Sequence, residues 1–324
     1  MEYRDAYDPI PLEDVHETHG PNDAGMMTHQ FYAFNTIITL QAYADVAQCA
    51  PAFDAARGAS RAFERRLSRT LPHSDISRLN AAAGKRVAVH DDTAELLRAA
   101  IGYCADSEGL FDVTVGSAVR LWNFHEGTER ADVERALAHV DWRALRVSEA
   151  GEAGGSWAQL ADPQAAVDVG GIAKGWIADR LSALLAEHGL DSFVVNLGGN
   201  VMAHGQKPDG SPWRVGLQDP RDKSSIVGAV TVRDASAVTS GVYERCFERD
   251  GVFYHHILDP KTGFPVETDA AGATVVARRS IDAEGYSTTL LALGIERGLA
   301  FARERDAILG AYFVDRDGKV AGIA

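Results

Sequence analysis

The stretch that decides the fold is Asp168-Val169-Gly170-Gly171-Ile172-Ala173-Lys174-Gly175. It closes an apolar run, Ala165–Val169, that we predict to be a strand, and it opens a helical pattern over Trp176–His188. The first amides of such a helix have no intrahelical acceptor, and the helix dipole places positive charge beside them. Lys174 adds a cation and Asp168 a carboxylate, so the stretch is typical of an anion site, most naturally for phosphate. It matches neither the Walker loop nor G-x-G-x-x-G, and a plain strand–helix turn with a solvated lysine stays open as the alternative.

The composition is that of a water-soluble globular protein. The chain has 324 residues, 46% of them apolar and 24% charged, which suffices for one large domain or two ordinary ones. The net charge of −14 argues against a nucleic-acid partner but does not forbid an anionic cofactor at a locally positive loop. Three scattered cysteines, no signal peptide and no apolar run of membrane-spanning length indicate a cytoplasmic protein without a membrane partner.

The order of patterns around this stretch favours an α+β fold. Residues 1–27 are predicted to be a flexible lead-in, and residues 28–324 a single domain. Upstream, the pattern predicts a strand over Phe31–Leu40 and a helix over Ala44–Leu67 with a break near Pro51. It then predicts a turn-rich loop over Leu71–Asn80, a helix over Thr93–Ser107 and a structured loop over Gly109–Gly116. Downstream it predicts short strands and then two helices, over Asp282–Leu293 and Glu296–Arg305. A closing hairpin of Ile308–Val314 and Lys319–Ile323 is predicted to follow. Strands and helices do not alternate strictly, which argues against a doubly wound parallel sheet.

Two further segments carry polar residues that a plain core does not need. Tyr254–Gly263 combines two histidines with a D-P-x-T-G turn, and strand alternation places His255 and His256 on opposite faces. A structural and a catalytic role for such a histidine both remain open. Glu284 and Thr288 lie four residues apart on a predicted helix, where a carboxylate and a hydroxyl on one face can ligate Mg²⁺. The alternative for Glu284 is a favourable charge in the first helical turn.

Six segments in one order resemble the ApbE family, the FAD:protein FMN transferases. They are PHSDISRLN (72–80), GLFDVTVGSAVRLW (109–122), DVGGIAKG (168–175), VVNLGGN (194–200), TSGVYERCFERDGVFYHHILDPKTGFPV (239–266) and AEGYSTTLLALG (283–294). The likeness extends from about Phe31 to the C-terminus. It implies a single α+β domain of the T-fold-like ApbE type, with mixed or antiparallel sheets and flanking helices. It also implies FAD as substrate, Mg²⁺ or Mn²⁺ at its pyrophosphate, FMN transfer to a Thr or Ser of an acceptor flavoprotein, and release of AMP.

The resemblance also assigns residues. His256 corresponds to the base that acts on the acceptor hydroxyl. The metal ligands correspond to the Gly171 carbonyl, Glu284 and Thr288. The positions that contact FAD correspond to Phe34, Leu110, Phe111, Asp112, Asp168, Lys174 and Leu258.

Two positions depart from the family pattern. Glu284 stands where the family usually has Asp, and one more methylene matters for Mg²⁺, which tolerates little distortion. Phe34-Asn35-Thr36 stands where Met-Gly-Thr is usual, so a side chain replaces the glycine beside the cofactor. Two alternatives to the transferase remain open: an FAD pyrophosphatase that gives FMN and AMP, and a non-catalytic flavin-binding protein. The sequence does not name the acceptor, the preferred metal or the oligomeric state.

Overall fold

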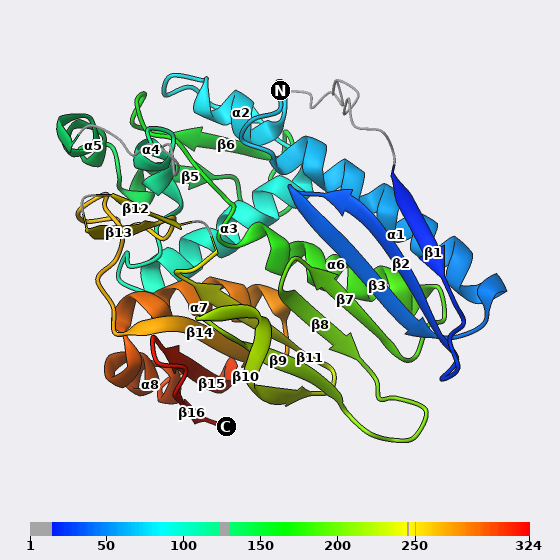
Figure 1. The fold of residues 1–324 in the computed structure, drawn as a ribbon. Helices are drawn as coiled ribbons and strands as arrows, with labels where there is room; N and C mark the ends of the chain where they lie inside the picture. Colours follow the sequence, from blue (N-terminus) through cyan, green and yellow to red (C-terminus); the bar gives the residue numbers. More distant parts are fainter. Residues whose placement is uncertain (1–14, 123–129, 245, 250) are drawn as a thin grey trace. The chain divides into compact units, whose positions relative to one another are not determined.

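The computed structural model describes residues 15–122, 130–244, 246–249 and 251–324 (Figure 1). These residues form two compact units. The sheet unit comprises residues 15–64, Ile172–Ser240 and Asp269–Ala324, and the loop-rich unit comprises Arg65–Gly171 and Gly241–Thr268. The boundary between the units therefore falls inside the glycine stretch, between Gly171 and Ile172.

The sheet unit is built on one nine-stranded sheet with the order β1-β2-β3-β7-β8-β11-β14-β15-β16. Neighbouring strands run antiparallel from β1 to β11 and again from β14 to β16, which confirms the α+β prediction. The strands are β1 (His16–His19), β2 (Met26–Ala33), β3 (Thr36–Tyr43), β7 (Phe193–Leu197), β8 (Asn200–His204), β11 (Ala235–Gly241), β14 (Ala270–Ala277), β15 (Ile308–Asp315) and β16 (Val320–Ile323).

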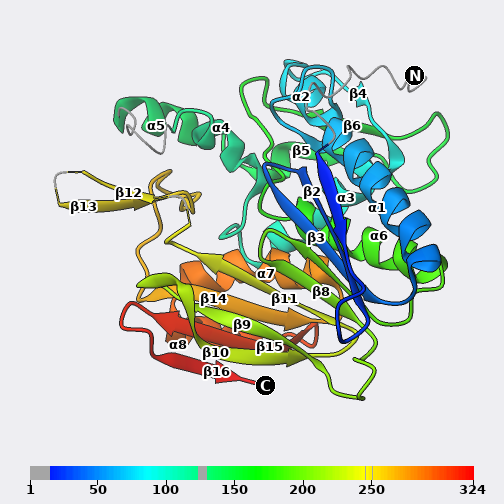
Figure 2. The ribbon, with the colours of Figure 1, turned by 45° about the vertical axis from the view of Figure 1, so that its right-hand side comes forward.

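Both faces are covered in the middle of this sheet (Figure 2). On one face, α6 packs on β7 and β8, α7 on β14, and α8 on β15. On the other, the β9–β10 hairpin buries Trp213 and Val230 against Val194 and Val276 of the sheet. Coverage on both sides explains why every residue of β14 is buried. The elements are α1 (Val46–Leu67, whose last three residues belong to the loop-rich unit), α6 (Ala173–Glu187), α7 (Ser280–Leu293), α8 (Ile295–Arg303), β9 (Trp213–Asp219) and β10 (Asp222–Val232).

The loop-rich unit consists of short elements joined by ordered loops. They are α2 (Asp75–Asn80), β4 (Val87–Ala88), α3 (Asp91–Asp106), η1 (Val113–Val115), α4 (Gly116–Val119), α5 (Arg130–Leu137), η2 (Trp142–Ala144), β5 (Leu145–Val147), β6 (Trp157–Leu160), β12 (Cys246–Arg249) and β13 (Val252–His255). The predicted helix Thr93–Ser107 is confirmed as α3, and in the sheet unit α6, α7, α8 and the closing hairpin β15–β16 are confirmed. No described helix combines the length and apolar character needed to cross a bilayer.

The prediction of one strand over Phe31–Leu40 is wrong. The segment is a hairpin of β2 and β3, closed between the paired residues Ala33 and Thr36. The two turn residues, Phe34 and Asn35, have φ of 54° and 59°. Two successive left-handed residues give the tight turn that suits the twist of antiparallel strands, and Asn tolerates this conformation better than most residues.

Two predictions about the chain after this hairpin are also corrected. Helix α1 continues through Pro51, because the burial of Cys49 and Phe53 around it outweighs the loss of one backbone donor. The second half of the predicted loop Leu71–Asn80 is helix α2. Its start is capped by Ser74, whose hydroxyl accepts a hydrogen bond from the Ser77 N–H at 2.9 Å.

The run Ala165–Val169 is not a strand, contrary to prediction. Side chains replace a neighbouring strand as its hydrogen-bond partners. Asn80 accepts from the Val167 N–H at 2.7 Å and donates to the Val167 carbonyl at 2.9 Å, and Ser117 accepts from the Ala166 N–H at 2.9 Å. The run is therefore an extended loop whose four apolar residues are buried.

The predicted lead-in, residues 1–27, contains strand β1, which pairs with β2 along its whole length. Residues 1–14 lie outside the described residues. The start of the domain at residue 28 stays a prediction.

Candidate functional site

Helices α6 and α7 approach closely at Gly175. A Cβ at this position would lie 2.6 Å from the Ser280 carbonyl oxygen and 2.9 Å from the Glu284 Cβ, so only glycine fits. One turn further along α6, the Asp179 carboxylate accepts hydrogen bonds from the Ser280 N–H at 2.6 Å and the Ile281 N–H at 3.0 Å. A side chain of α6 thus caps the N-terminus of α7. This contact fixes the register of the two helices, that is, how far along α7 each residue of α6 lies.

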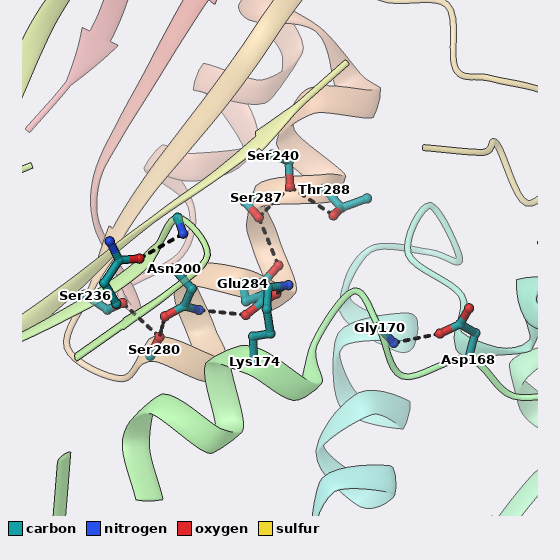
Figure 3. Close-up of polar contacts among 12 residues, drawn as sticks. Asp168, Gly170, Lys174, Asn200, Ser236, Ser240, Ser280, Glu284, Ser287 and Thr288 are labelled. Atoms are coloured by element: carbon teal, nitrogen blue, oxygen red, sulfur yellow. Dashed lines mark hydrogen bonds and ion pairs between the residues drawn. The ribbon is translucent and has the colours of Figure 1, made fainter. Parts of the chain in front are cut away.

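This register places Lys174 of α6 beside Glu284 of α7 (Figure 3). The Lys174 Nζ lies 2.5 Å from the Glu284 Oε1, and the Asn200 Nδ2 donates to the Glu284 Oε2 at 2.7 Å. The Glu284 side chain is only 5% exposed, so a carboxylate is held almost free of water by one cation and one amide. A buried charge of this kind needs such partners, because desolvation alone would strongly disfavour it.

The amide that binds Glu284 is itself fixed. The Asn200 Oδ1 accepts a hydrogen bond from the Ser280 hydroxyl at 2.8 Å, and the Ser236 hydroxyl donates to the Ser280 Oγ at 2.8 Å (Figure 3). Asn200 is 1% exposed and opens β8, directly after the Gly198-Gly199 pair. The orientation of its amide is therefore set by a buried polar chain that begins in the sheet.

Thr288 lies one turn after Glu284 on α7 and belongs to a hydroxyl cluster. The Ser240 Oγ lies 2.8 Å from the Ser287 Oγ and 3.2 Å from the Thr288 Oγ1, and the Ser287 hydroxyl donates to the Glu284 carbonyl at 3.1 Å. Thr288 is half-buried, whereas Ser287 is fully buried. The structure thus confirms that Glu284 and Thr288 lie on neighbouring turns of one helix within a polar environment.

Phe34, the other predicted site residue of the sheet unit, occupies the β2–β3 turn. Its N–H donates to the Glu64 Oε1 at 2.8 Å, and the Tyr32 hydroxyl donates to the Asn35 Oδ1 at 2.6 Å. Asn35, which stands where the resemblance implies a family glycine, is exposed and accepts this hydrogen bond. The departure therefore stabilises the turn that presents the half-buried Phe34.

In the loop-rich unit, Asp168 stabilises the glycine loop. Its Oδ1 accepts from the Gly170 N–H at 2.8 Å, and its Oδ2 lies 3.0 Å from the Arg69 Nε. Gly171 follows with its backbone against Phe111, because a Cβ there would lie 3.2 Å from the Phe111 ring. The structure therefore brings together two predicted residues, Gly171 and Phe111.

Asp112, next to Phe111, accepts hydrogen bonds that stabilise the loop around it. Its Oδ1 accepts from the N–H and the hydroxyl of Thr114, at 2.7 and 2.6 Å, and its Oδ2 accepts from the Trp142 N–H at 3.1 Å. Burial raises the pKa of Asp112, while these hydrogen bonds act in the opposite direction. Leu110 is half-buried and Phe111 buried, so the loop presents a fixed surface; its contact with flavin stays a prediction.

The two histidines of β13 and its continuation differ in burial as alternation predicted. His255 is 4% exposed, and its Nε2 lies 3.2 Å from the Val266 carbonyl oxygen, which is a structural contact. His256 is half-buried and lies one residue beyond the strand. Leu258 is buried beside Trp122 and Val133, so only its backbone is available for the predicted contact.

The predicted site residues are divided between the two units. The sheet unit carries Phe34, Lys174, Glu284 and Thr288, and the loop-rich unit carries Leu110, Phe111, Asp112, Asp168, Gly171, His256 and Leu258. Sequence reasoning did not assign roles to Asn200, Ser240 or Asp179. Asn200 and Ser240 belong to the VVNLGGN and TSG segments, which could have indicated them, whereas no pattern indicated Asp179.

The donor set of α7 suits a hard cation in its chemistry. Glu284 offers a carboxylate and Thr288 a hydroxyl, both of which are oxygen ligands that Mg²⁺ prefers. Within the described residues, no group of three or more His, Cys, Asp or Glu side chains could hold a metal, so any ion here depends on this mixed set. Both oxygens of the Glu284 carboxylate already accept an N–H donor, one from Lys174 and one from Asn200.

The chain is similar to known proteins over most of its length. The profile of the ApbE family matches residues 34–313. An FAD:protein FMN transferase of Treponema pallidum is 39% identical over 277 residues, covering 80% of this chain and 75% of that protein. One from Klebsiella pneumoniae is 33% identical and covers 79% of each chain. The crystal structure of the ApbE protein from Thermotoga maritima has a TM-score of 0.82 at 25% identity, covering 91% of this chain and 96% of that one. The flavinyl transferase ApbE of Pseudomonas stutzeri, in its apo form, has a TM-score of 0.73 at 31% identity, covering 97% and 95%.

These matches define the protein as an enzyme of the transferase class. The chain belongs to the ApbE family.

The cap on α7 makes the stability of the protein depend on pH. Burial raises the pKa of Asp179 to about 6, although its two N–H donors act in the opposite direction. Because the pKa of Asp179 in the folded protein lies above the ordinary Asp value of 3.8, the folded state favours the protonated carboxyl. This contribution to stability is complete below pH 4 and is lost as the pH rises through about 6.

We therefore expect Asp179→Asn, which stays neutral, to gain stability relative to the wild type as the pH rises from 4 to 7. The gain should be on the order of 2 kcal/mol, since each pKa unit corresponds to about 1.4 kcal/mol. Denaturant unfolding at several pH values measures it. Glu187→Gln, at the exposed end of α6, is the control. Curves for Asp179→Asn that run parallel to the wild type would contradict this assignment.

Proposed function

We propose that the protein transfers FMN from FAD to a Thr or Ser hydroxyl of an acceptor protein and releases AMP, in a reaction that depends on a divalent cation. The observation that carries the proposal is the cluster of Lys174 and Asn200 around the buried Glu284 carboxylate. It lies in a chain of which about four fifths is similar to enzymes named FAD:protein FMN transferase. Such a cluster keeps a cation and a carboxylate ready for a pyrophosphate and its counter-ion.

Glu284 and Thr288 would hold Mg²⁺ or Mn²⁺, with the Gly171 carbonyl as the third predicted ligand. When bound, the ion would neutralise charge on the pyrophosphate oxygens of FAD. Lys174 would add its positive charge at the same phosphates, and Asp168 would keep the glycine loop in shape through the Gly170 N–H. Phe34, Leu110, Phe111, Asp112 and Leu258 are the residues that we propose to contact the dinucleotide.

His256 would act as the base. It takes the proton from the acceptor hydroxyl, whose oxygen forms a bond to the phosphorus of the FMN moiety. The bond between that phosphorus and the bridging oxygen breaks, and AMP leaves with the oxygen. FMN then stays on the acceptor as a phosphoester. Half-burial of His256 is consistent with a group that meets an incoming protein side chain, whereas His255 is committed to Val266.

All three cysteines are free, and two of them, Cys49 and Cys104, are buried. Free thiols persist in reducing compartments, so we propose a cytoplasmic enzyme with a cytoplasmic acceptor. The acceptor would carry a segment similar to D-x-x-[ST]-G-[AS]-[ST].

The proposal is tested by incubating the protein with FAD, Mg²⁺ and a peptide carrying this acceptor pattern. We expect the peptide to gain the mass and fluorescence of FMN, with AMP formed in equal amount. A peptide in which Ala replaces the hydroxyl residue is the control. FMN and AMP released at the same rate without any acceptor would instead identify a pyrophosphatase, and FAD bound without turnover under any metal would identify a flavin-binding protein.

A further inference from the structure

Lys174 and Glu284 contact each other, although the proposed function has each of them bind a different group. Lys174 would meet phosphate, and Glu284 would meet the divalent cation. In the structure they bind each other, with the Lys174 Nζ at 2.5 Å from the Glu284 Oε1. A second positive charge at the same carboxylate would be repelled by the ammonium, and this repulsion is strong where water is largely excluded.

The two donors on Glu284 differ in their freedom to leave. Asn200 is 1% exposed and is held by Ser280, which is held in turn by Ser236. Lys174 is attached to a flexible stem, and its side chain is 30% exposed. Of the two, the ammonium of Lys174 is the group that can move away from the carboxylate without breaking the buried polar chain.

We propose that Lys174 is a resident counter-charge that a divalent cation must displace from Glu284, and that the displaced ammonium binds a phosphate of the dinucleotide. The inference rests on the proposed function. It adds that the Lys174 ammonium leaves Glu284 before the cation binds there. Without a nucleotide the cation binds weakly, because it has to separate an ion pair. With phosphate present, Lys174 has a new partner, so nucleotide and cation strengthen each other's binding.

The longer side chain of Glu284 fits this role. An Asp in its place would withdraw the carboxylate by roughly one C–C bond length. An ammonium that now lies 2.5 Å from the Oε1 would then lose its close contact unless α6 and α7 moved together, and their approach is already limited by Gly175. The glutamate is thus the feature of this chain that closes the ion pair.

The test is the binding of Mn²⁺ to the protein in the absence of any nucleotide, followed through the electron paramagnetic resonance signal of free Mn²⁺. We expect Lys174→Met to bind Mn²⁺ at least tenfold more tightly than the wild type. Lys174→Arg keeps the cation and should behave like the wild type. Lys85→Met, which removes an exposed lysine of the loop-rich unit, is the matched control and should also leave the affinity unchanged.

Lys174→Met leaves a buried carboxylate with one partner fewer and could lower stability, so thermal unfolding is recorded for each variant. Lys174→Gln, whose amide can still donate a hydrogen bond but carries no charge, provides the second test and should also bind Mn²⁺ more tightly. Equal or weaker binding by both variants, or no binding by any of the proteins, would overturn the inference. The measurement uses neither FAD nor acceptor, so a failure of FMN transfer and a failure of this displacement are distinguishable.

Discussion

His256→Ala is expected to bind FAD normally and to lose FMN transfer by about 10²- to 10⁴-fold, the usual contribution of a general base. The reason is that the acceptor hydroxyl is a poor nucleophile until its proton is removed, whereas FAD binding depends on other side chains. Flavin fluorescence measures the binding, and flavin carried by the acceptor peptide measures the transfer. A variant as active as the wild type would remove His256 from the mechanism.

The neighbouring histidine offers a matched control. His255 is buried against the Val266 carbonyl, so His255→Ala should lower the temperature of unfolding through a lost hydrogen bond and a cavity. The folded fraction of this variant should still transfer FMN. His256→Ala should give the opposite pattern, with unchanged unfolding and lost transfer. Because the two residues are adjacent, a general disturbance of the segment would affect both alike.

The order of elements in the sheet unit could be predicted well because its signals are local. The amphipathic pattern over Trp176–His188 predicts α6, the apolar segments near the C-terminus predict the closing hairpin β15–β16, and both are confirmed. The hairpin at Phe34-Asn35 was missed because aromatic and β-branched residues continue through the turn, and Asn35 gives only a weak signal without a glycine. Its left-handed conformation is imposed by the pairing of β2 and β3, which no local pattern encodes.

The loop-rich unit was harder to predict because tertiary contacts decide it. Ala165–Val169 has the composition of a strand, yet side chains bind the backbone at its centre. Asn80 binds Val167 from 87 residues away along the chain, and Ser117 binds Ala166 from 49 residues away. Side chains that act as backbone partners over such separations leave no periodic trace. The same holds for Asp179, whose cap on α7 depends on the close approach of two helices at Gly175.

The site itself could be predicted only through resemblance. Lys174, Glu284 and Thr288 are ordinary residues on amphipathic or buried helices, and each had a structural alternative. Their convergence is visible only once Gly175 brings α6 and α7 together. The structure adds one fact about Glu284 that the sequence does not show: its carboxylate accepts hydrogen bonds from both Lys174 and Asn200.

Glu284→Ala is the second change with a large expected effect. Loss of the carboxylate should reduce transfer by at least about 10²-fold, because a bound cation contributes several kcal/mol and each 1.4 kcal/mol is a factor of ten. The remaining activity should no longer respond to Mg²⁺ or to EDTA. Transfer rates over a range of Mg²⁺ concentrations measure this, and residual activity that EDTA still abolishes would contradict Glu284 as a ligand.

The interpretation requires that the fold survives, since Lys174 and Asn200 both lose a partner in Glu284→Ala. Glu284→Gln keeps the shape of the side chain and removes only the charge, so it should unfold closer to the wild type while losing the same metal response. Glu296→Ala, on the first turn of α8, removes a carboxylate that is not buried and should leave metal dependence intact. If both Glu284 variants lose the metal response while only Glu284→Ala loses stability, the carboxylate charge acts in the reaction rather than in the packing of α7. Loss of stability in both, with the metal response intact, would mean that the buried ion pair chiefly holds α6 and α7 together and that the cation binds elsewhere.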